Sequence, residues 1–358
     1  MSLGAGRQTI RSGIFASILL TAAALATYGQ AASQSPAQAS GQSSSNPPQK
    51  SEPSPPSFLP PASQNGDLLL NKNDVDRNIW ANAKTYVDLP VKEIQAKVEE
   101  LQGLEPESSQ EGLSSLLDRV GETSIDLLHH TPNVASREEQ ITDQRRVSQV
   151  SQGAMGSPVI APPSRDRQEF GYLLLSHTIE GGVELKEYRT DKNGQPLGSS
   201  RSRNGQMTEG FASEWLRLLP GNRRESRFRY LGRQEVDKRK TLVLAFAQIP
   251  EEVKSPARFS FDGIQVSVLV QGLVWVDASN FHIVKIREDL LAPRPDVYLK
   301  EVTTRIRFAE VPMEKAGTSL WLPVEAAISW NCKGVAVEQR HIYSDYRLYA
   351  VRTKIIPQ

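Results

Sequence analysis

Residues 264–276 have the clearest pattern in the chain and read Ile264-Gln265-Val266-Ser267-Val268-Leu269-Val270-Gln271-Gly272-Leu273-Val274-Trp275-Val276. Every even-numbered position is Ile, Val or Gly, whereas the odd-numbered positions mix Gln, Ser, Leu and Trp. Successive side chains of a β-strand point to opposite faces, so the pattern predicts one long strand with its even-numbered face in the core. The other face is half apolar, and its residues Leu269, Leu273 and Trp275 either fill the core or line an apolar ligand cavity. Gly272 predicts a bend or a bulge.

A period of two also dominates the sequence on both sides of this stretch. It predicts further strands at residues 172–178, 183–190, 227–235, 241–249, 281–288, 298–308, 320–330 and 335–349. Turn sequences such as Asp191-Lys192-Asn193-Gly194 separate several neighbouring strands. Consecutive strands joined by short turns form antiparallel pairs. The sequence therefore predicts one antiparallel sheet of about eight to nine strands.

Helical patterns precede these strands. Val91, Ile94, Val98 and Leu101 recur at helical spacing behind Pro90, a residue that suits the first turn of a helix. A second helix is predicted at residues 110–130, residues 136–151 are either a helix end or a strand, and a short helix is predicted at residues 208–219. The fold class that follows is α+β, with N-terminal helices followed by a curved, half-barrel-like antiparallel sheet.

The N-terminus has the layout of a secretory signal peptide. Arg7 and Arg11 precede the apolar run 14–26, and small residues follow, so cleavage is predicted after Ala26 or, preferably, after Ala31. The run is too short to cross about 30 Å of hydrocarbon. We therefore expect an exported protein, periplasmic or extracellular, with no transmembrane segment in the mature chain.

Composition divides the chain into four parts. Residues 1–31 are the predicted signal peptide, and residues 32–66 are a Ser-, Pro- and Gln-rich stretch with few apolar side chains, predicted to be a disordered linker. Residues 67–150 form the predicted helical segment, and residues 170–350 form the predicted antiparallel β-sheet domain.

The charge balance argues against nucleic acid as a partner. The formal charge is +1 for the whole chain and −1 after loss of the signal peptide, because Arg7 and Arg11 leave and no acidic residue does. A general nucleic-acid binder needs a basic surface. Only residues 223–240 are locally basic, and they are either the solvated face of a hairpin or a contact for an anionic polymer or lipid headgroup.

Few residues could carry chemistry. None of the five histidines has the spacing of a metal site, and the adjacent pair His129 and His130 would point about 100° apart on a helix; the others are His177, His282 and His341. The sequence has neither a G-x-S-x-G motif nor a phosphate-binding G-x-x-x-x-G-K loop. No metal-binding or cofactor-binding residue is predicted, and no cofactor.

Cysteine and carboxylate pairs give no catalytic residue either. Cys332 is the only cysteine, so the chain forms no internal disulfide and the fold rests on its core. Lys333 beside it could lower the pKa of the thiol, but a nucleophilic cysteine also needs a base. The adjacent pairs Glu138-Glu139 and Glu251-Glu252 are expected to lie in solvent. No catalytic residue is therefore predicted, and we expect the protein not to be an enzyme.

Several strings resemble known groups of proteins. They are Pro132-Asn133-Val134 with Arg137-Glu138-Glu139, residues 227–233, residues 271–277 continuing to 283–287, and Leu320-Trp321-Leu322-Pro323. Together they resemble uncharacterised exported proteins of soil bacteria, over roughly residues 90–350. Residues 230–232, 242–246, 272–277 and 283–286 also resemble, at the level of fold, periplasmic lipoprotein carriers of the outer-membrane lipoprotein-sorting type. That resemblance implies a curved sheet that wraps helices around a cavity for acyl chains, and it transfers no ligand residues.

The leading functional hypothesis is an exported, non-enzymatic cell-envelope protein that binds an apolar or lipid-like ligand in a curved sheet. Its basis is the signal peptide, the lack of catalytic motifs and the half-apolar face of residues 264–276. Two alternatives stay open. One is a structural or protein-interaction module with an envelope protein as its partner, and the other is an enzyme of unknown class.

Overall fold

The computed structural model of the protein describes residues 16–19, 77–146, 163–179, 182–195, 197, 208–209, 211–212, 214–254, 256–261, 264–313 and 316–349. The described strands form one sheet of 11 strands and a second sheet of 4 strands. All of the predicted linker, and all of the predicted signal peptide except residues 16–19, lie outside the described residues.

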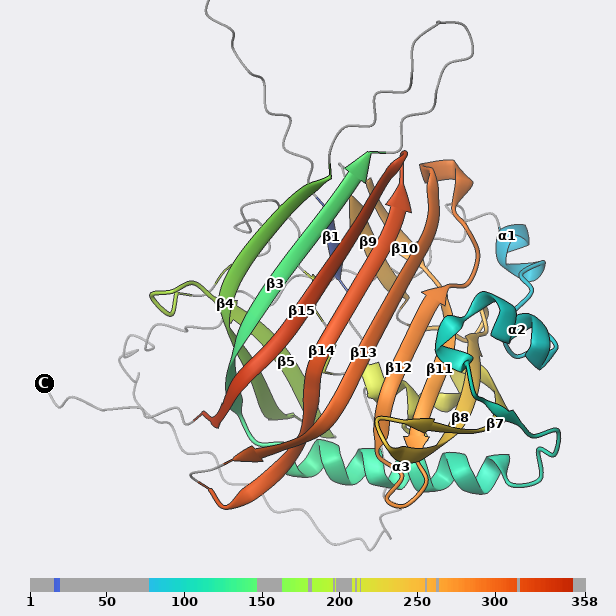
Figure 1. Cartoon of the computed structure of the whole chain (residues 1–358), viewed down its shortest axis with the longest axis horizontal. Coiled ribbons are helices and arrows are strands. Elements are labelled where there is room, and N and C mark those ends of the chain that lie inside the picture. Colours follow the sequence, from blue (N-terminus) through green and yellow to red (C-terminus); the bar gives the residue numbers. More distant parts are fainter. Residues whose placement is uncertain are drawn as a thin grey trace, which may run out of the picture.

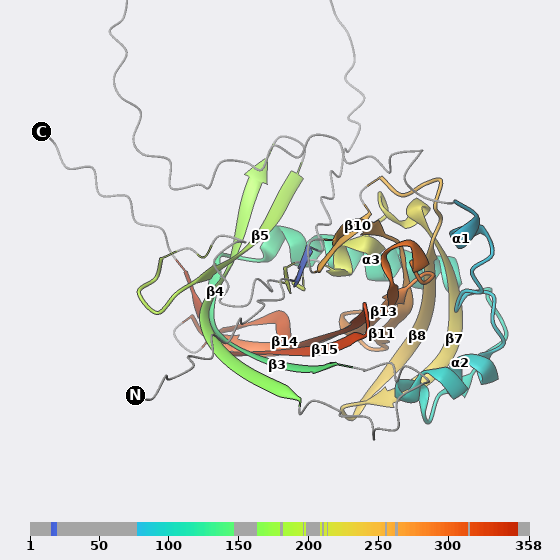
Figure 2. The same ribbon diagram turned by 90° about the horizontal axis from the view of Figure 1, so that it is seen from above.

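The large sheet is antiparallel throughout and strongly curved (Figures 1 and 2). Its strands, in spatial order, are β2 (Glu105–Pro106), β7 (Ser226–Val236), β8 (Arg239–Gln248), β11 (Val270–Asp277), β12 (Ile283–Leu290), β13 (Leu299–Met313), β14 (Thr318–Cys332), β15 (Val335–Leu348), β3 (Val134–Arg146), β4 (Ser164–Ile179) and β5 (Gly182–Thr190). The edge strands β2 and β5 do not pair with each other, so the sheet stays open. The predicted class of curved antiparallel sheet is confirmed, but the predicted number of eight to nine strands is too low.

The second sheet lies inside the curve of the first, in the order β10 (Ile264–Val268), β9 (Ala257–Phe261), β1 (Ala16–Leu19) and β6 (Thr208–Glu209) (Figure 2). Strand β1 pairs antiparallel with β9 and parallel with β6. Both β9 and β10 come from the same hairpin. Strand β1 belongs to the stretch that the sequence assigns to the signal peptide.

Helices cover two parts of the large sheet. Helices α1 (Arg77–Ala81) and α2 (Val91–Lys97) lie outside the curve, and α3 (Leu113–His130) crosses one end of the strands (Figures 1 and 2). Helix α3 buries Leu116, Val120 and Leu128, which recur at helical spacing, against the rest of the core. Four short 3₁₀ helices complete the described elements: η1 (Glu99–Leu101), η2 (Glu214–Leu218), η3 (Arg223–Glu225) and η4 (Pro295–Val297).

Several sequence predictions need correction. The long strand predicted at residues 264–276 is two strands that belong to different sheets, with the break at Leu269. Gly272 lies in regular pairing, and a Cβ there would come within 2.1 Å of the carbonyl oxygen of Arg287. The glycine therefore allows close packing rather than a bend. The helix predicted at residues 208–219 is only the short η2 preceded by β6, and residues 134–146 are a central strand.

The domain boundaries at residues 67–150 and 170–350 stay a prediction. Strand β3 falls within the first of these ranges, yet it lies between β15 and β4 of the large sheet. Buried side chains from both ranges, including Ile94, Val120, Val243 and Ile328, share one hydrophobic core. The helical segment and the sheet therefore pack as one body in the described part of the chain.

Candidate functional site

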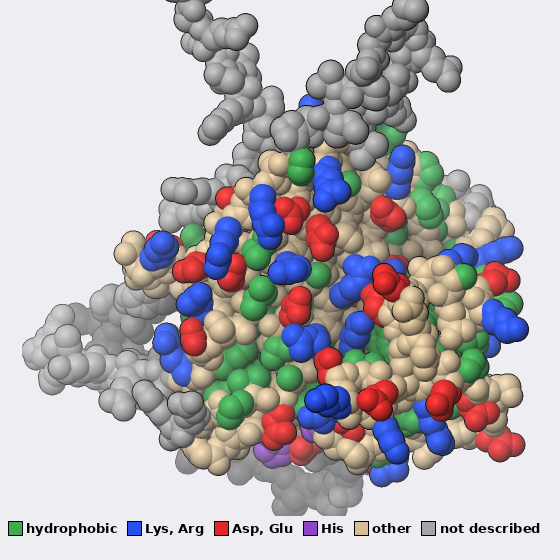
Figure 3. Space-filling view, viewed as in Figure 1, with side chains coloured by type: hydrophobic (Ala, Val, Ile, Leu, Met, Phe, Trp, Pro, Cys, Tyr) green, Lys and Arg blue, Asp and Glu red, His purple; other side chains and the backbone are tan. Residues whose placement is uncertain are grey.

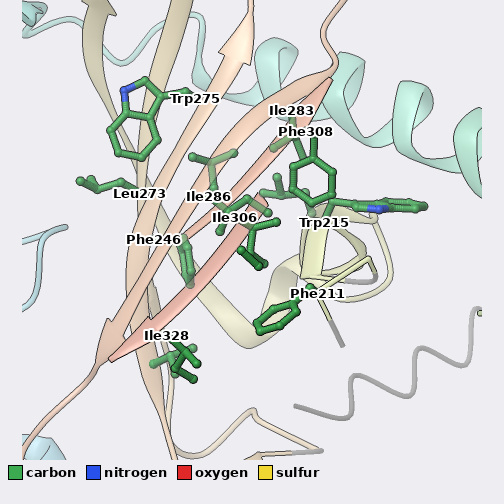
Figure 4. Packing of buried hydrophobic residues seen from close by; sticks show 14 of the residues in the cluster. Phe211, Trp215, Phe246, Leu273, Trp275, Ile283, Ile286, Ile306, Phe308 and Ile328 are labelled. Atoms are coloured by element: carbon green, nitrogen blue, oxygen red, sulfur yellow. The ribbon is translucent and has the colours of Figure 1, made fainter. Parts of the chain in front are cut away.

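The concave face of the large sheet is divided into an apolar half and a polar half. On strands β8 and β11–β14 its buried side chains are mostly apolar, among them Phe246, Val274, Ile286, Ile306 and Ile328 (Figure 4), with Glu288 and Thr304 as polar exceptions. On the adjoining strands β15, β3, β4 and β5 the inward side chains are mostly polar and equally buried: Ser136, Glu138, Gln140, Thr142, Tyr172, Arg189, Gln339, His341 and Tyr343. Burying so many polar side chains is unfavourable unless each has a hydrogen-bond partner. We therefore take this half of the concave face as the candidate binding site.

Short elements from outside the large sheet fill the apolar half. The segment around η2 supplies Phe211 and Trp215, and strand β9 supplies Phe259 and Phe261, whose rings pack on Trp330 at 6.4 and 6.2 Å between centroids. We call these two elements the plug: residues 211–212 with 214–219, and the paired strands β9 and β10. The concave surface of the sheet is therefore covered by segments that are not hydrogen-bonded into it.

Two small cavities remain between the described residues. One of about 20 Å³ lies between β9 and the sheet and is lined by residues that include Phe259, Val270 and Glu288. The other, of about 10 Å³, lies under α3 beside Trp215 and Trp321. Each has room for about one water molecule. Neither cavity holds an apolar chain unless the plug moves.

The centre of the polar half is a buried ion pair that also holds a histidine. Arg189 of β5 donates two hydrogen bonds to the carboxylate of Glu138 on β3, with N–O distances of 2.5 and 2.7 Å. His341 of β15 lies 2.7 Å from the same carboxylate through Nδ1. All three side chains are at most 2% exposed. We call Glu138, Arg189 and His341 the buried triad.

The electrostatics of the buried triad fix its protonation. Burial alone would raise the pKa of Glu138, but the Arg189 guanidinium and the bond from His341 outweigh it and lower that pKa to about 2. Burial also lowers the pKa of His341, against the opposing effect of Glu138. The imidazole is therefore neutral. Its Nδ1–H donates to Glu138, which leaves Nε2 as a hydrogen-bond acceptor.

Two tyrosines flank the buried triad. The rings of Tyr172 and Tyr343 are 4.9 Å apart, and Tyr343 is opposite Glu138 in the strand pairing. Burial raises the pKa of both hydroxyls well above the ordinary value, so both stay protonated. Within the described residues, Tyr172 Oη, Tyr343 Oη and His341 Nε2 are buried without a hydrogen-bond partner. An unsatisfied buried polar group costs about 1–3 kcal/mol, so three in one cluster indicate a binding site.

A second charged cluster joins the plug to the apolar half of the sheet. Arg217 of η2 lies 3.0 Å from both Glu214 and Glu288, the latter on β12. Burial, and then the neighbouring Glu288, raise the pKa of Glu214 well above its usual value of 4.5. The two carboxyl groups therefore share one guanidinium and hold a proton at Glu214.

Glu214→Gln should flatten the pH dependence of stability. A carboxyl group whose pKa is raised by folding stabilises the folded state fully below about pH 4.5 and loses that contribution as the pH rises through the folded pKa. The wild type should therefore lose up to about 1.4 kcal/mol per pH unit from this group above pH 4.5. Urea unfolding of wild type and variant between pH 5 and 8 measures this. Exposed Glu252→Gln is the control, and equal slopes in wild type and Glu214→Gln would contradict the assignment.

The three residues that the sequence offered as a cavity lining lie elsewhere. Leu273 and Trp275 point away from Phe211 and Trp215, toward the α1–α2 side of the sheet (Figure 4). There the indole of Trp275 donates to Gln234, which in turn bonds the carbonyl oxygens of Glu100 and Gln102. Leu269 packs in a smaller cluster with Trp80. A lining role for these three residues stays a prediction.

The convex face carries many charges (Figure 3). Exposed ion pairs on the polar half include Arg167 with Glu139, at 2.6 Å. Part of the locally basic stretch 223–240 is engaged in ion pairs within the chain, because Arg227 pairs with Asp88 at 2.6 Å and Arg239 with Asp277 at 2.8 Å. Charges of both signs are thus interspersed over this surface.

The remaining candidate residues are scattered. Cys332 is fully buried, and His282 stacks on Trp321 with 4.9 Å between ring centroids. Glu138 is wrongly predicted to lie in solvent: neighbouring residues of a strand face opposite sides, so Glu138 points inward while Glu139 points outward. Residues 136–140 are polar on both faces of the strand, so no pattern in the sequence distinguishes the buried face. Nothing in the sequence indicated the partners Arg189 and His341, which are 51 and 203 residues away.

The described residues contain no group of three or more His, Cys, Asp or Glu side chains placed to hold a metal ion. Among the same residues, no helix combines the length and the apolar character needed to span a membrane.

Comparison with known proteins gives distant structural matches. No protein-family model matches the chain, and no curated protein matches it. Among solved structures, it is similar to a putative outer membrane lipoprotein-sorting protein domain from Vibrio parahaemolyticus, with a TM-score of 0.35 and 12% identity over 66% of this chain and 94% of that chain. It is also similar to a DUF1329 family protein from Desulfovibrio piger, with a TM-score of 0.34 and 11% identity over 67% of this chain and 94% of that chain. A LolA superfamily protein from Nitrosomonas europaea gives a TM-score of 0.30 and 14% identity over 66% of this chain and 94% of that chain.

The first match is described as an outer membrane lipoprotein-sorting protein domain. Proteins of that type are the ones that residues 230–232, 242–246, 272–277 and 283–286 resemble at the level of fold. The matches give no support to the resemblance to exported proteins of soil bacteria. Similarity of this extent does not assign the chain to a family.

Proposed function

We propose that this is an exported, non-enzymatic protein of the cell envelope that binds a lipid-like ligand on the concave face of its open sheet. The observation that carries the proposal is the division of that face into adjoining apolar and polar halves. A ligand with an apolar chain and a polar head matches such a surface. The apolar half takes the chain, with a gain of about 25 cal/mol per Å² of apolar surface buried.

The plug supports the proposal because its apolar side chains pack on the concave face without belonging to the large sheet. Phe211, Phe259 and Phe261 are fully buried there, although none of them belongs to the large sheet. Strand β1, of apolar sequence, pairs along β9 within the same curve. If residues 1–31 leave as a signal peptide, the mature protein loses this strand, and the edge of β9 and the space beside it become available to a ligand.

Fluorescence quenching by a bromine-labelled long-chain alcohol tests the proposal, because bromine quenches the tryptophans that it contacts. Trp330 lies on the concave face, against the plug, and Trp275 lies on the opposite face of the sheet. Titration of the purified protein should quench its fluorescence. Trp330→Phe should reduce the quenching, with Trp215 of the plug accounting for the remainder, and the matched control Trp275→Phe should keep it.

Two outcomes would overturn the proposal. They are the lack of any quenching in the wild type, and quenching that persists in Trp330→Phe but disappears in Trp275→Phe. Mass spectrometry of solvent extracts from protein purified from its host should also show a co-purifying apolar molecule. Recovery of a stoichiometric protein partner instead would favour an interaction module. N-terminal sequencing of the same material should show that the mature chain begins at Ala32, as expected for cleavage after Ala31.

A further inference from the structure

The polar half of the concave face defines the head of the ligand, and this inference rests on the proposed function. We infer that the buried triad and its two tyrosines bind an uncharged, hydroxyl-bearing headgroup, as in a long-chain alcohol or an acylglycerol. The atoms that carry it are Tyr172 Oη, Tyr343 Oη and His341 Nε2. All three are buried and have no hydrogen-bond partner within the described residues.

The three side chains lie in one cluster on the concave face of the sheet. His341 and Tyr343 are two residues apart on β15, so they point to the same face about 7 Å apart. The ring of Tyr172 is 4.9 Å from that of Tyr343. The ring of His341 packs at 5.0 Å on Phe211, which belongs to the plug. A ligand that replaces Phe211 would therefore meet the imidazole at the border between the polar and apolar halves.

The hydrogen-bonding roles of these atoms select the headgroup. In the neutral imidazole of His341, whose pKa is lowered by burial, Nδ1 carries the proton that is donated to Glu138, so Nε2 accepts. The tyrosine hydroxyls are protonated and can donate. The complementary group must donate one hydrogen bond and accept one or two, which a hydroxyl does.

The charges around the site disfavour an anionic head. The carboxyl groups of Glu138 and Glu187 face the tyrosines, and Arg189 is the cationic side chain among them in the described cluster. Its guanidinium is already used in the two-bonded contact with Glu138. A carboxylate or phosphate would be buried without a free cation to balance it, which is unfavourable. A neutral hydroxyl carries no such cost.

Three probes of equal chain length test the inference: dodecanol, dodecane and dodecanoate. Wild-type protein should bind dodecanol about ten-fold more tightly than dodecane, and more tightly than dodecanoate at pH 7. Tyr343→Phe and Tyr172→Phe keep the ring and remove only the hydroxyl, so each should bring the dodecanol-to-dodecane ratio toward one. Tyr298→Phe is the control, because Tyr298 is 69% exposed and should leave the ratio unchanged.

The outcomes separate this inference from the proposed function. Equal binding of dodecanol and dodecane by the wild type would overturn the headgroup site but leave the apolar site standing. Tighter binding of dodecanoate than of dodecanol would overturn the uncharged headgroup. Failure to bind any of the three probes would overturn the proposed function itself. Circular dichroism spectra of the two Tyr→Phe variants should match the wild type, so that loss of selectivity is not loss of fold.

Discussion

Arg189→Met is expected to lower the free energy of unfolding by about 3–5 kcal/mol. The variant removes the cation that donates two hydrogen bonds to Glu138 and leaves that carboxylate fully buried with only His341 beside it. Taking a charge out of water is unfavourable unless a partner compensates it. Urea unfolding at pH 7 measures the loss.

Two controls make this expectation specific. Arg137 is next to Glu138 in the chain, but it faces solvent and pairs with Glu169 at 3.6 Å, so Arg137→Met should change stability by no more than about 0.5 kcal/mol. In the double variant Arg189→Met with Glu138→Gln, no buried charge is left and the glutamine oxygen can still accept from His341. It should therefore be more stable than Arg189→Met alone. Equal losses in Arg189→Met and Arg137→Met would show that the buried charge is not what the guanidinium stabilises.

Trp275→Ala is expected to cost about 3–5 kcal/mol. The indole is fully buried between β11 and the α1–α2 side, and Lys285 lies 4.8 Å from the ring centroid. Removing it leaves a cavity and also takes the donor away from Gln234, whose amide group holds the carbonyl oxygens of Glu100 and Gln102. The loss should thus weaken the attachment of the helical segment as well as the core.

Two further variants serve as controls for the expected loss of stability in Trp275→Ala. Thermal and urea unfolding measure all three proteins. Tyr298→Ala removes an aromatic side chain that is 69% exposed and should cost less than about 0.5 kcal/mol. Trp275→Phe keeps most of the apolar volume and should fall between the wild type and Trp275→Ala. A Trp275→Ala protein as stable as the wild type would mean that the α1–α2 side packs without help from this residue.

The alternation of residues 264–276 predicted strand structure because burial on one face imposes a period of two. It could not predict the break at Leu269, since no Gly or Pro marks it and both halves keep the same period. Nor could it say which face would be inside the curve. That depends on the α1–α2 segment, whose Tyr86 binds Gln271 across 185 residues of sequence.

Strand β3 shows why the candidate site escaped prediction. Its sequence, VASREEQITDQRR, has only Val134, Ala135 and Ile141 as apolar residues, and its inward positions after Val134 are Ser, Glu, Gln and Thr. A polar face that packs against other polar groups gives no hydrophobic period. Only the pairing of β3 with β15 and β4 shows that these side chains are buried and where their partners lie.

The same pairing has a consequence for the order of folding. Most neighbours in the large sheet are joined by short turns, and hairpins of that kind close quickly because little chain entropy is lost. Strands β3 and β15 are different, since residues 134 and 348 are partners at one end of their ladder. Their contact must wait for nearly the whole intervening chain to become compact. The last kinetic step of assembly should then join two preformed groups of strands along the β3–β15 seam, and the burial of Glu138 beside His341 would report its completion.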